Sequence, residues 1–129
     1  MRQAINTNKA PKAIGPYSQA ISVNGMIFTS GQIPIDPNTG NIIREDFNLE
    51  VLQIINNIKA ILEEGGSSLN NVIKYTVYMT DLSLFPILNK IFDDFYFGNI
   101  PPARSTIQVS ALPKDVRVEI EAIASIEDV

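Results

Sequence analysis

Arg104 is the residue in this chain that is best placed to bind an anion. Pro101 and Pro102 precede it and fix the backbone where it enters a segment that alternates like a β-strand. In that segment Arg104, Thr106 and Gln108 lie on one face. A guanidinium on a stiff strand can hold a carboxylate through two hydrogen bonds. The same pattern also describes a solvent-exposed arginine on the outer face of a sheet, the usual position of a charged side chain.

Glu119 and Glu121 are the acidic counterpart of Arg104. They share one face of the last predicted strand with Arg117. If this strand lies beside that of Arg104 and both side chains point to an uncovered face, Arg104 and Glu119 lie close together. They then form either a surface ion pair worth about 0–1 kcal/mol, or a small anion site in which Arg104 holds a carboxylate and Glu119 orients a water molecule. Two glutamates at this spacing either raise one pKa and assist proton transfer, or are both solvated.

Two loop motifs place further polar groups beside strands. Gly15-Pro16-Tyr17-Ser18-Gln19 is a stiff turn, in which Tyr17 either lines a pocket or packs under its own loop. Thr29-Ser30-Gly31-Gln32 ends a strand at a glycine, which lets a ligand approach backbone N–H groups closely. This second motif lacks the glycine spacing and the lysine of a phosphate-binding loop.

The composition excludes several classes of chemistry. The chain has no cysteine, which excludes disulfides and thiol catalysis. It has no histidine, so proton transfer has to use Asp, Glu, Lys, Tyr or water, and we predict neither a metal nor another cofactor. The net charge of −4, with ten scattered Lys and Arg, does not fit a nucleic-acid surface. Because no signal-peptide core or run of ~18 apolar residues occurs, we expect a cytoplasmic protein without a membrane partner.

The hydrophobic pattern predicts a single domain, residues 1–129, with six strands and two helices. The first helix is expected between a cap at Asp46 or Asn48 and Gly65-Gly66, and the second between Asp81 or Ser83 and Gly98. Strands are expected at 2–5, 19–23, 26–30, 72–79, 104–109 and 116–126. The order β-β-β-α-β-α-β-β predicts an α+β fold, an α/β sandwich with both helices on one face of a mixed sheet. The other face then meets water or another subunit.

Four blocks of the sequence resemble the RidA/YjgF family of enamine and imine deaminases. They read AIGPYSQA over 13–20, TSGQIP over 29–34, PARST over 102–106 and LPKDVRVEIEAIA over 112–124. The blocks occur in the family's order, and the resemblance runs nearly end to end. It implies a chorismate-mutase-like fold and a homotrimer with ligand clefts between subunits.

The resemblance also implies roles for individual residues. Arg104 matches the arginine that binds the substrate carboxylate, and Glu119 matches the glutamate assigned to water activation or proton transfer. The residues that match others lining the cleft are Tyr17, Ser30, Gly31 and Asn89. Thr106 stands where relatives often have cysteine and is expected to contribute mainly its backbone.

The activity that the resemblance implies is hydrolytic deamination of 2-aminoacrylate, 2-aminocrotonate and their imine tautomers, 2-iminopropanoate and 2-iminobutanoate, to 2-oxo acids and ammonia. Pyridoxal-phosphate enzymes such as serine and threonine dehydratases release these intermediates. Two other classes stay open: a non-catalytic protein that binds 2-oxo acids in the same clefts, and an RNA-acting translation inhibitor, which the acidic composition disfavours. The segment 95–102 looks shorter than in some relatives, so we expect the rim of the cleft to differ.

Overall fold

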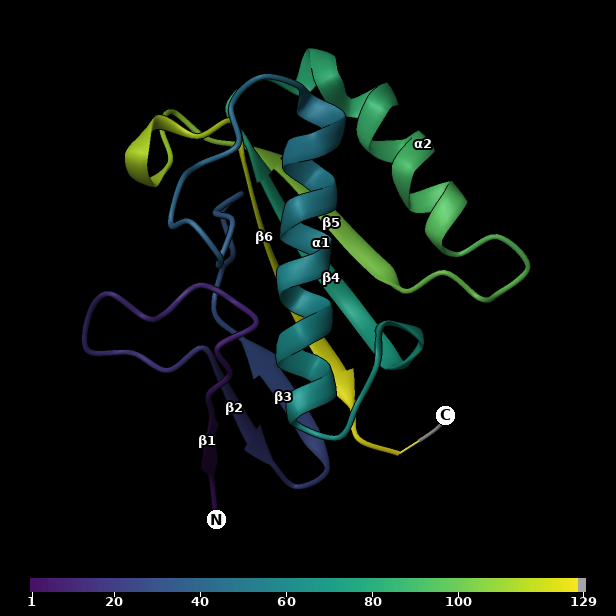
Figure 1. The fold of residues 1–129 in the computed structure, drawn as a ribbon. Coiled ribbons are helices and arrows are strands. Elements are labelled where there is room, and N and C mark those ends of the chain that lie inside the picture. The colour runs from purple at the N-terminus through teal and green to yellow at the C-terminus, as the bar shows by residue number, and fades with distance from the viewer. Residues whose placement is uncertain (128–129) are drawn as a thin grey trace.

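The computed structural model describes residues 1–127, and a six-stranded mixed sheet forms its centre (Figure 1). The strands are β1 (Gln3–Ile5), β2 (Ala20–Val23), β3 (Met26–Thr29), β4 (Val72–Met79), β5 (Ala103–Gln108) and β6 (Val118–Ser125). Across the sheet they follow the order β1-β2-β3-β6-β4-β5. β4 and β5 are parallel, and every other neighbouring pair is antiparallel. The last strand of the chain therefore lies in the middle of the sheet.

Helix α1 (Phe47–Glu64) begins at Asp46, whose carboxylate accepts a hydrogen bond from the Asn48 N–H at 2.8 Å. It ends at Gly65, which lies so close to the sheet that an added Cβ would meet the Ile5 and Ile27 side chains at 2.6 and 2.7 Å. The buried apolar side chains of α1 recur at helical spacing, as the sequence predicts. They are Phe47, Val51, Ile54, Ile55, Ile58, Ile61 and Leu62.

Helix α2 (Phe85–Phe95) follows a short 3-10 turn that Asp81 caps by accepting the Ser83 N–H at 2.9 Å. Pro86 falls in the first turn of α2, where its missing N–H needs no partner. The helix ends at Phe95, before the predicted stop at Gly98. The next residue, Tyr96, is buried and holds the chain there, because its hydroxyl donates to the Leu69 carbonyl at 2.9 Å.

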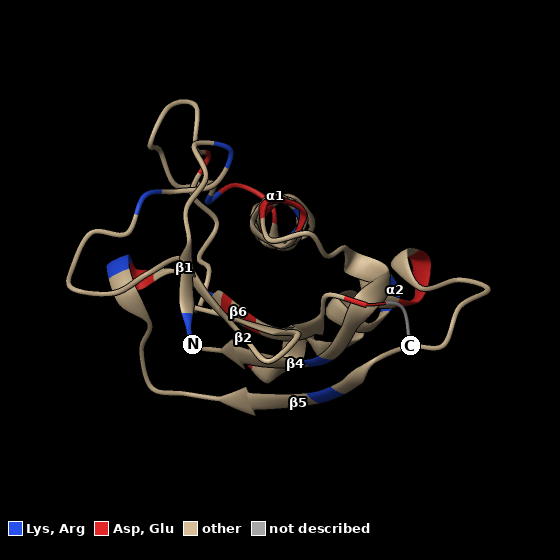
Figure 2. Ribbon diagram, turned by 90° about the horizontal axis from the view of Figure 1, so that it is seen from below, with Lys and Arg blue, Asp and Glu red and all other residues tan. Residues whose placement is uncertain are grey.

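Both helices lie on the same side of the sheet, which confirms the predicted α/β sandwich (Figure 2). The apolar core fills the space between them and the sheet. No helix or strand of residues 1–127 covers the opposite face, where Phe28 and Ile107 are 43% and 45% exposed. We call this the open face. Within residues 1–127 no helix is long and apolar enough to cross a bilayer.

The strand pairing places Arg104 and Glu119 on different faces of the sheet. Arg104 pairs with Tyr75 of β4, whose buried ring contacts Phe92 of α2, so Arg104 points to the helix side of the sheet. Glu119 pairs with Tyr78 on the open face. The condition under which Arg104 and Glu119 would be neighbours on one uncovered face is therefore not met, because β4 separates their strands and their side chains point to opposite sides.

Arg117 also departs from its predicted place. The last strand begins at Val118, and the Arg117 side chain turns back to form an ion pair with Glu50 of α1, which is only 2% exposed. The Phe47 ring centre lies 5.5 Å from the Arg117 guanidinium carbon. Arg117 thus does not share a face with Glu119; it ties the start of β6 to the first turn of α1.

Candidate active site

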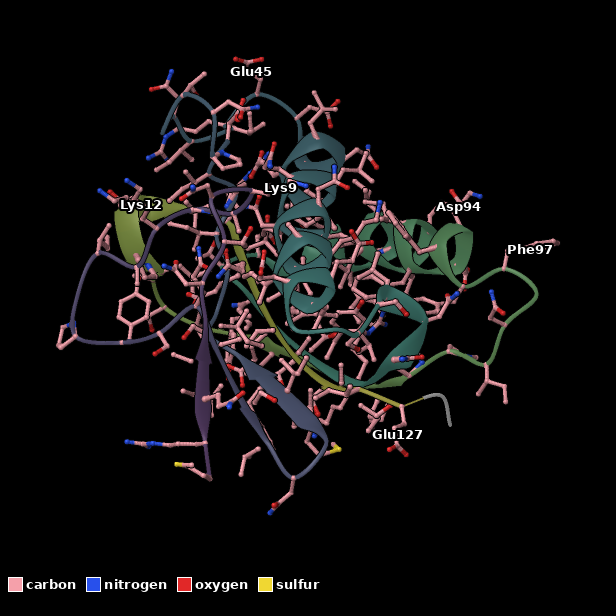
Figure 3. The ribbon with its side chains drawn as sticks, turned by 60° about the horizontal axis from the view of Figure 1, so that its bottom comes forward. Lys9, Lys12, Glu45, Asp94, Phe97 and Glu127 are labelled. Atoms are coloured by element: carbon pink, nitrogen blue, oxygen red, sulfur yellow. The ribbon has the colours of Figure 1, made fainter. Side chains whose placement is uncertain are left out.

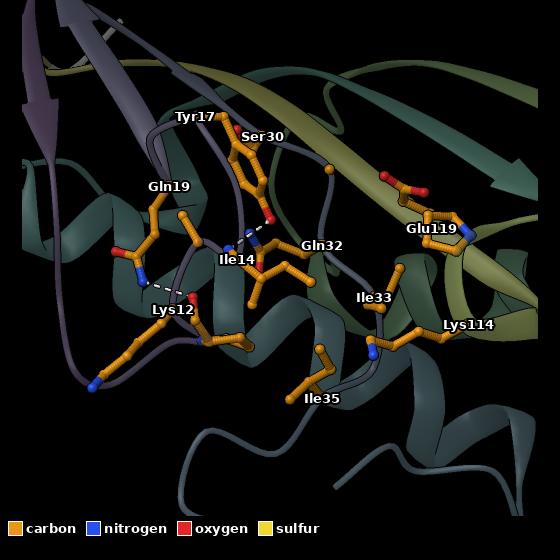
Figure 4. Close-up of a pocket in the computed structure, with 14 residues that line it drawn as sticks. Lys12, Ile14, Tyr17, Gln19, Ser30, Gln32, Ile33, Ile35, Lys114 and Glu119 are labelled. Atoms are coloured by element: carbon orange, nitrogen blue, oxygen red, sulfur yellow. Dashed lines mark hydrogen bonds between the residues drawn. The ribbon is translucent and has the colours of Figure 1, made fainter. Parts of the chain in front are cut away.

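A cavity of about 380 Å³ opens beside Glu119 and the segment that follows β3 (Figure 4). Four of the predicted site residues line it: Tyr17, Ser30, Gly31 and Glu119. They come from three separate stretches of the chain that the sheet brings together. We call this group the glutamate half of the site.

Gln19 holds the loop that forms one wall of this cavity. Its side chain is buried, its Oε1 accepts from the Thr7 N–H at 2.8 Å, and its Nε2 donates to the Pro11 carbonyl at 2.8 Å. Ser30 Oγ donates to the Ser18 carbonyl at 2.6 Å, which fixes the two loops to each other. Tyr17 stays half-exposed at the mouth. Gln19 was not among the site residues predicted from the sequence. The one signal for a special role was its polar side chain at the start of a predicted strand that is otherwise mostly apolar.

Glu119 lies directly against the backbone of Gly31. Gln32 and Ile120 exchange two backbone hydrogen bonds, at 2.8 and 3.1 Å, which draw this segment onto β6. A Cβ on Gly31 would stand 2.0 Å from Glu119 Oε2, so this position has to be glycine for the carboxylate to keep its place. Burial raises the pKa of Glu119, and the charge of Glu121 on the same strand raises it further.

Arg104 belongs to a second cavity, of about 760 Å³, between α2, β5 and the segment that joins them. Its Nη2 donates to Asn89 Oδ1, and its guanidinium carbon lies 5.1 and 5.4 Å from the ring centres of Phe92 and Phe85. No carboxylate of residues 1–127 forms an ion pair with it. Burial lowers the pKa of Arg104, but a guanidinium stays charged at neutral pH. An unpaired, oriented cation at a cavity fits a carboxylate ligand.

We call Arg104, Asn89 and their neighbours the arginine half of the site. Thr106 lies two residues beyond Arg104 on the same face, and its Oγ1 is buried without a hydrogen-bond partner in residues 1–127. That Thr106 contributes mainly its backbone stays a prediction. Neither Phe85 nor Phe92 was among the site residues predicted from the sequence. The signal was there, since Phe85, Asn89 and Phe92 recur at i, i+4 and i+7 on one helix face.

The two halves do not meet within one chain. The glutamate half opens beside the open face, whereas the arginine half lies on the helix side of the edge strand β5. In the part of the chain that the structure describes, no three His, Cys, Asp or Glu side chains are grouped so as to hold a metal ion. The groups available for chemistry are thus the Arg104 guanidinium, the half-buried Glu119 carboxylate and backbone amides. Further charged side chains line the cavities as well, Lys12 and Lys114 on the glutamate half and Lys90, Asp93 and Asp94 on the arginine half.

Comparison with known proteins identifies the family to which the chain belongs. Residues 7–126 match the family described as endoribonuclease L-PSP. The chain belongs to the endoribonuclease L-PSP family. Among family members, a RutC family protein of Pyrococcus abyssi is 55% identical over 95% of this chain and 96% of its own length. A 2-iminobutanoate/2-iminopropanoate deaminase of Salmonella typhimurium is 44% identical over 96% of this chain and 98% of its own length.

The family's solved structures have the same fold. The crystal structure of E. coli TdcF with bound serine has a TM-score of 0.90 to this chain, at 44% identity, and the match covers 95% of this chain and 98% of TdcF. The resemblance of the four sequence blocks to RidA/YjgF proteins is confirmed by these matches, and with it the predicted fold of a mixed sheet with two helices on one face.

Proposed function

We propose that this chain is a hydrolytic deaminase of small 2-imino acids, with 2-iminopropanoate and 2-iminobutanoate as substrates and a 2-oxo acid and ammonia as products. The observation that carries the proposal is the unpaired Arg104 guanidinium at one cavity and the half-buried Glu119 carboxylate at another, in a chain without histidine or cysteine. The name of the Salmonella relative supports the reaction. Serine, which is bound to TdcF, carries a nitrogen and a carboxylate group on the same carbon, as a 2-imino acid does. The bound serine therefore supports this class of ligand.

The proposed site is shared by two subunits. A substrate that touches both Arg104 and Glu119 requires two copies of the chain, because these residues lie on opposite faces of one sheet. A contact that joins one surface of a subunit to a different surface of the next closes into a ring when the rotation permits it. We propose a homotrimeric ring, the assembly that the sequence resemblance implies, with the open face turned toward the other subunits. Light scattering of the purified chain tests the assembly, and a monomer would contradict it.

The proposed reaction needs little beyond orientation and one proton acceptor. Arg104 binds the carboxylate of the imino acid, and Glu119 accepts a proton from a water molecule as the water oxygen bonds to C2. Glu119 then passes this proton to the nitrogen, and the C2–N bond breaks as the C2 hydroxyl gives its own proton to Glu119 and becomes the carbonyl, so that ammonia and the 2-oxo acid leave. A protonated imine is already electrophilic, so a single carboxylate suffices as the base. A coupled assay tests this: with threonine dehydratase in excess, the chain should accelerate the appearance of 2-oxobutanoate.

The raised pKa of Glu119 predicts a pH dependence. Glu119 acts as a base only when ionised, so the rate should fall as the pH drops through its pKa. Replacing Glu121 with glutamine removes a negative charge and lowers the pKa of Glu119, so the acidic limb of the profile should move to lower pH. The measurement is the enzyme-dependent rate as a function of pH in both proteins, since spontaneous hydrolysis at each pH is common to them.

Tyr78→Phe is the matched control for this pH experiment. The Tyr78 hydroxyl donates to Glu121 Oε1 at 3.1 Å, so the substitution removes that hydrogen bond and leaves the Glu121 charge in place. The acidic limb of the Tyr78→Phe profile should therefore not move to lower pH, as that of the Glu121→Gln profile does. An unmoved limb in Glu121→Gln would show that Glu119 is not the titrating base.

Gly31→Ala should lower the rate of deamination by about 100-fold, because displacing the base by an ångström disrupts its alignment with the reacting water. The new Cβ meets only the mobile end of Glu119, so the melting temperature should change little. Gly65→Ala is the opposite case: its Cβ meets the core side chains Ile5 and Ile27, and it should lower the melting temperature without affecting the acidic limb. Equal rates in Gly31→Ala and wild type would contradict the role of Gly31.

An activity on RNA, which the family description names, finds little support in this chain. Cleavage of RNA commonly uses histidine as acid and base, and the chain has none. Its Lys and Arg residues are also scattered, as Figure 2 shows, rather than gathered on one face. Salt-dependent RNA binding by the purified protein would reverse this assessment.

A further inference from the structure

The segment between α2 and β5 presents two apolar side chains almost completely to solvent. Phe97 is 88% and Ile100 is 93% exposed, although each belongs to a large apolar residue type. Figure 3 shows Phe97 projecting from the body of the molecule, on the side opposite Lys12. The loop of residues 96–102, which we call the prong, also forms one wall of the Arg104 cavity.

The prong is held at both ends. At its start Tyr96 is buried, and its hydroxyl lies 2.7 Å from the Tyr75 hydroxyl. Inside it the Asn99 N–H donates to the Tyr96 carbonyl at 2.9 Å, in a turn that Gly98 permits with a φ of +78°. Two prolines stiffen its exit into β5. A fixed loop that exposes Phe97 and Ile100 is suited to bind an apolar surface, because little conformational freedom is lost when it does so.

A matching surface rims the other half of the site. At the mouth of the Glu119 cavity Ile14 is 74% and Tyr17 is 52% exposed. In the proposed reaction the carboxylate on Arg104 and the carbon attacked by the water on Glu119 are bonded to each other. The Arg104 cavity of one subunit must therefore open directly onto the Glu119 cavity of the next. The walls of the two cavities then meet as well.

We infer that the prong of one subunit packs on the Ile14–Tyr17 loop of its neighbour and closes the shared cleft with an apolar wall. The occupant of this surface is a second copy of the chain, and the inference rests on the proposed sharing of the site between subunits. The closed cleft shields the imine from bulk water and offers the substrate side chain the Phe97 ring, which lines the Arg104 cavity. This arrangement selects imino acids with short apolar side chains over charged ones.

Cross-linking tests the contact without any substrate, and the absence of cysteine from the chain makes every introduced thiol unique. The double variant Phe97→Cys/Ile14→Cys, treated with a short bismaleimide, should give covalent dimers and trimers on a denaturing gel. Each single variant should give only the background of collisions between separate assemblies. Phe97→Cys/Leu49→Cys is the matched control, because Leu49 is 49% exposed at the start of α1 but lines neither cavity.

Cross-linking of the double variant no greater than that of the control would overturn the inference, as would a species linked within one chain. The coupled assay on the wild-type chain reports separately on the deaminase. Efficient cross-linking without deamination would keep the prong contact and contradict the proposed reaction. Deamination without cross-linking would do the reverse.

Discussion

Replacing Arg104 with alanine is expected to lower the rate of 2-oxo acid formation in the coupled assay by about 100-fold, since charged hydrogen bonds of this kind contribute about 1.5–3 kcal/mol. The guanidinium is held by Asn89 and by two phenylalanine rings and has no carboxylate partner in residues 1–127. Its removal therefore costs the ligand an anchor and breaks no ion pair within the protein. The fold should persist, with a melting temperature close to that of the wild type.

Two further variants serve as controls for Arg104→Ala. Arg104→Lys keeps the charge but loses the planar pair of donors, so its rate should lie between those of Arg104→Ala and the wild type. Arg2→Ala removes an arginine from the exposed N-terminus and should leave the rate unchanged. An Arg104→Ala protein that still accelerates 2-oxobutanoate formation as the wild type does would refute the carboxylate-anchor role.

Glu119→Gln should reduce turnover by a factor on the order of 10² or more while leaving the binding of 2-oxobutanoate nearly intact. Glutamine has almost the same shape as glutamate and fits the same space against Gly31, but it cannot accept the proton of the attacking water. Turnover is measured in the coupled assay and binding by calorimetry. The pair of measurements also separates an enzyme from a non-catalytic binding protein, since a protein that only binds 2-oxo acids would show no difference in rate between glutamine and glutamate at this position.

Mixing the two inactive variants tests whether subunits share the site. When Arg104→Ala and Glu119→Gln chains are unfolded together and refolded, an intact cleft forms wherever the arginine of one variant faces the glutamate of the other. With random assembly into rings this occurs at about one interface in four. The mixture should therefore regain about a quarter of the wild-type rate, whereas either variant refolded alone should keep its roughly 100-fold lower rate. No recovery would place both residues in the same subunit's site.

Local patterns in the sequence were sufficient to predict the elements but not their neighbours. The cap at Asp46, the helix that follows it and the break between the second and third strands each depend on residues close together in the chain, and each appears as predicted. The alternation around Arg104 correctly gave the residues that share its face. It could not show which face α2 covers, because that depends on strand order, and strand order is set by contacts between distant segments.

The candidate site shows the same division. Four sequence blocks indicated a set of site residues, and the family resemblance added Asn89 from the second helix. The residues within the blocks are Tyr17, Ser30, Gly31, Arg104, Thr106 and Glu119. The blocks could not indicate that Arg104 and Asn89 form a hydrogen bond across α2 and β5, or that Gly31 lies against Glu119, since both contacts arise from tertiary packing. The resemblance implied ligand clefts between subunits, but the blocks could not show that Arg104 and Glu119 fall in separate halves of one subunit. That result follows from β4, which lies between the strands of Arg104 and Glu119.

The central place of β6 has a consequence for how the protein is made. Until the last strand has been synthesised, the sheet exists as two disconnected pieces, β1-β2-β3 and β4-β5, each with an unpaired edge where β6 will later insert. Unpaired edges of this kind readily pair with other chains. A nascent chain that ends before Val118 therefore has a divided sheet and lacks Glu119. Completion of the fold and arrival of the proposed base coincide in a single late step, so an incomplete chain contains Arg104 but lacks Glu119.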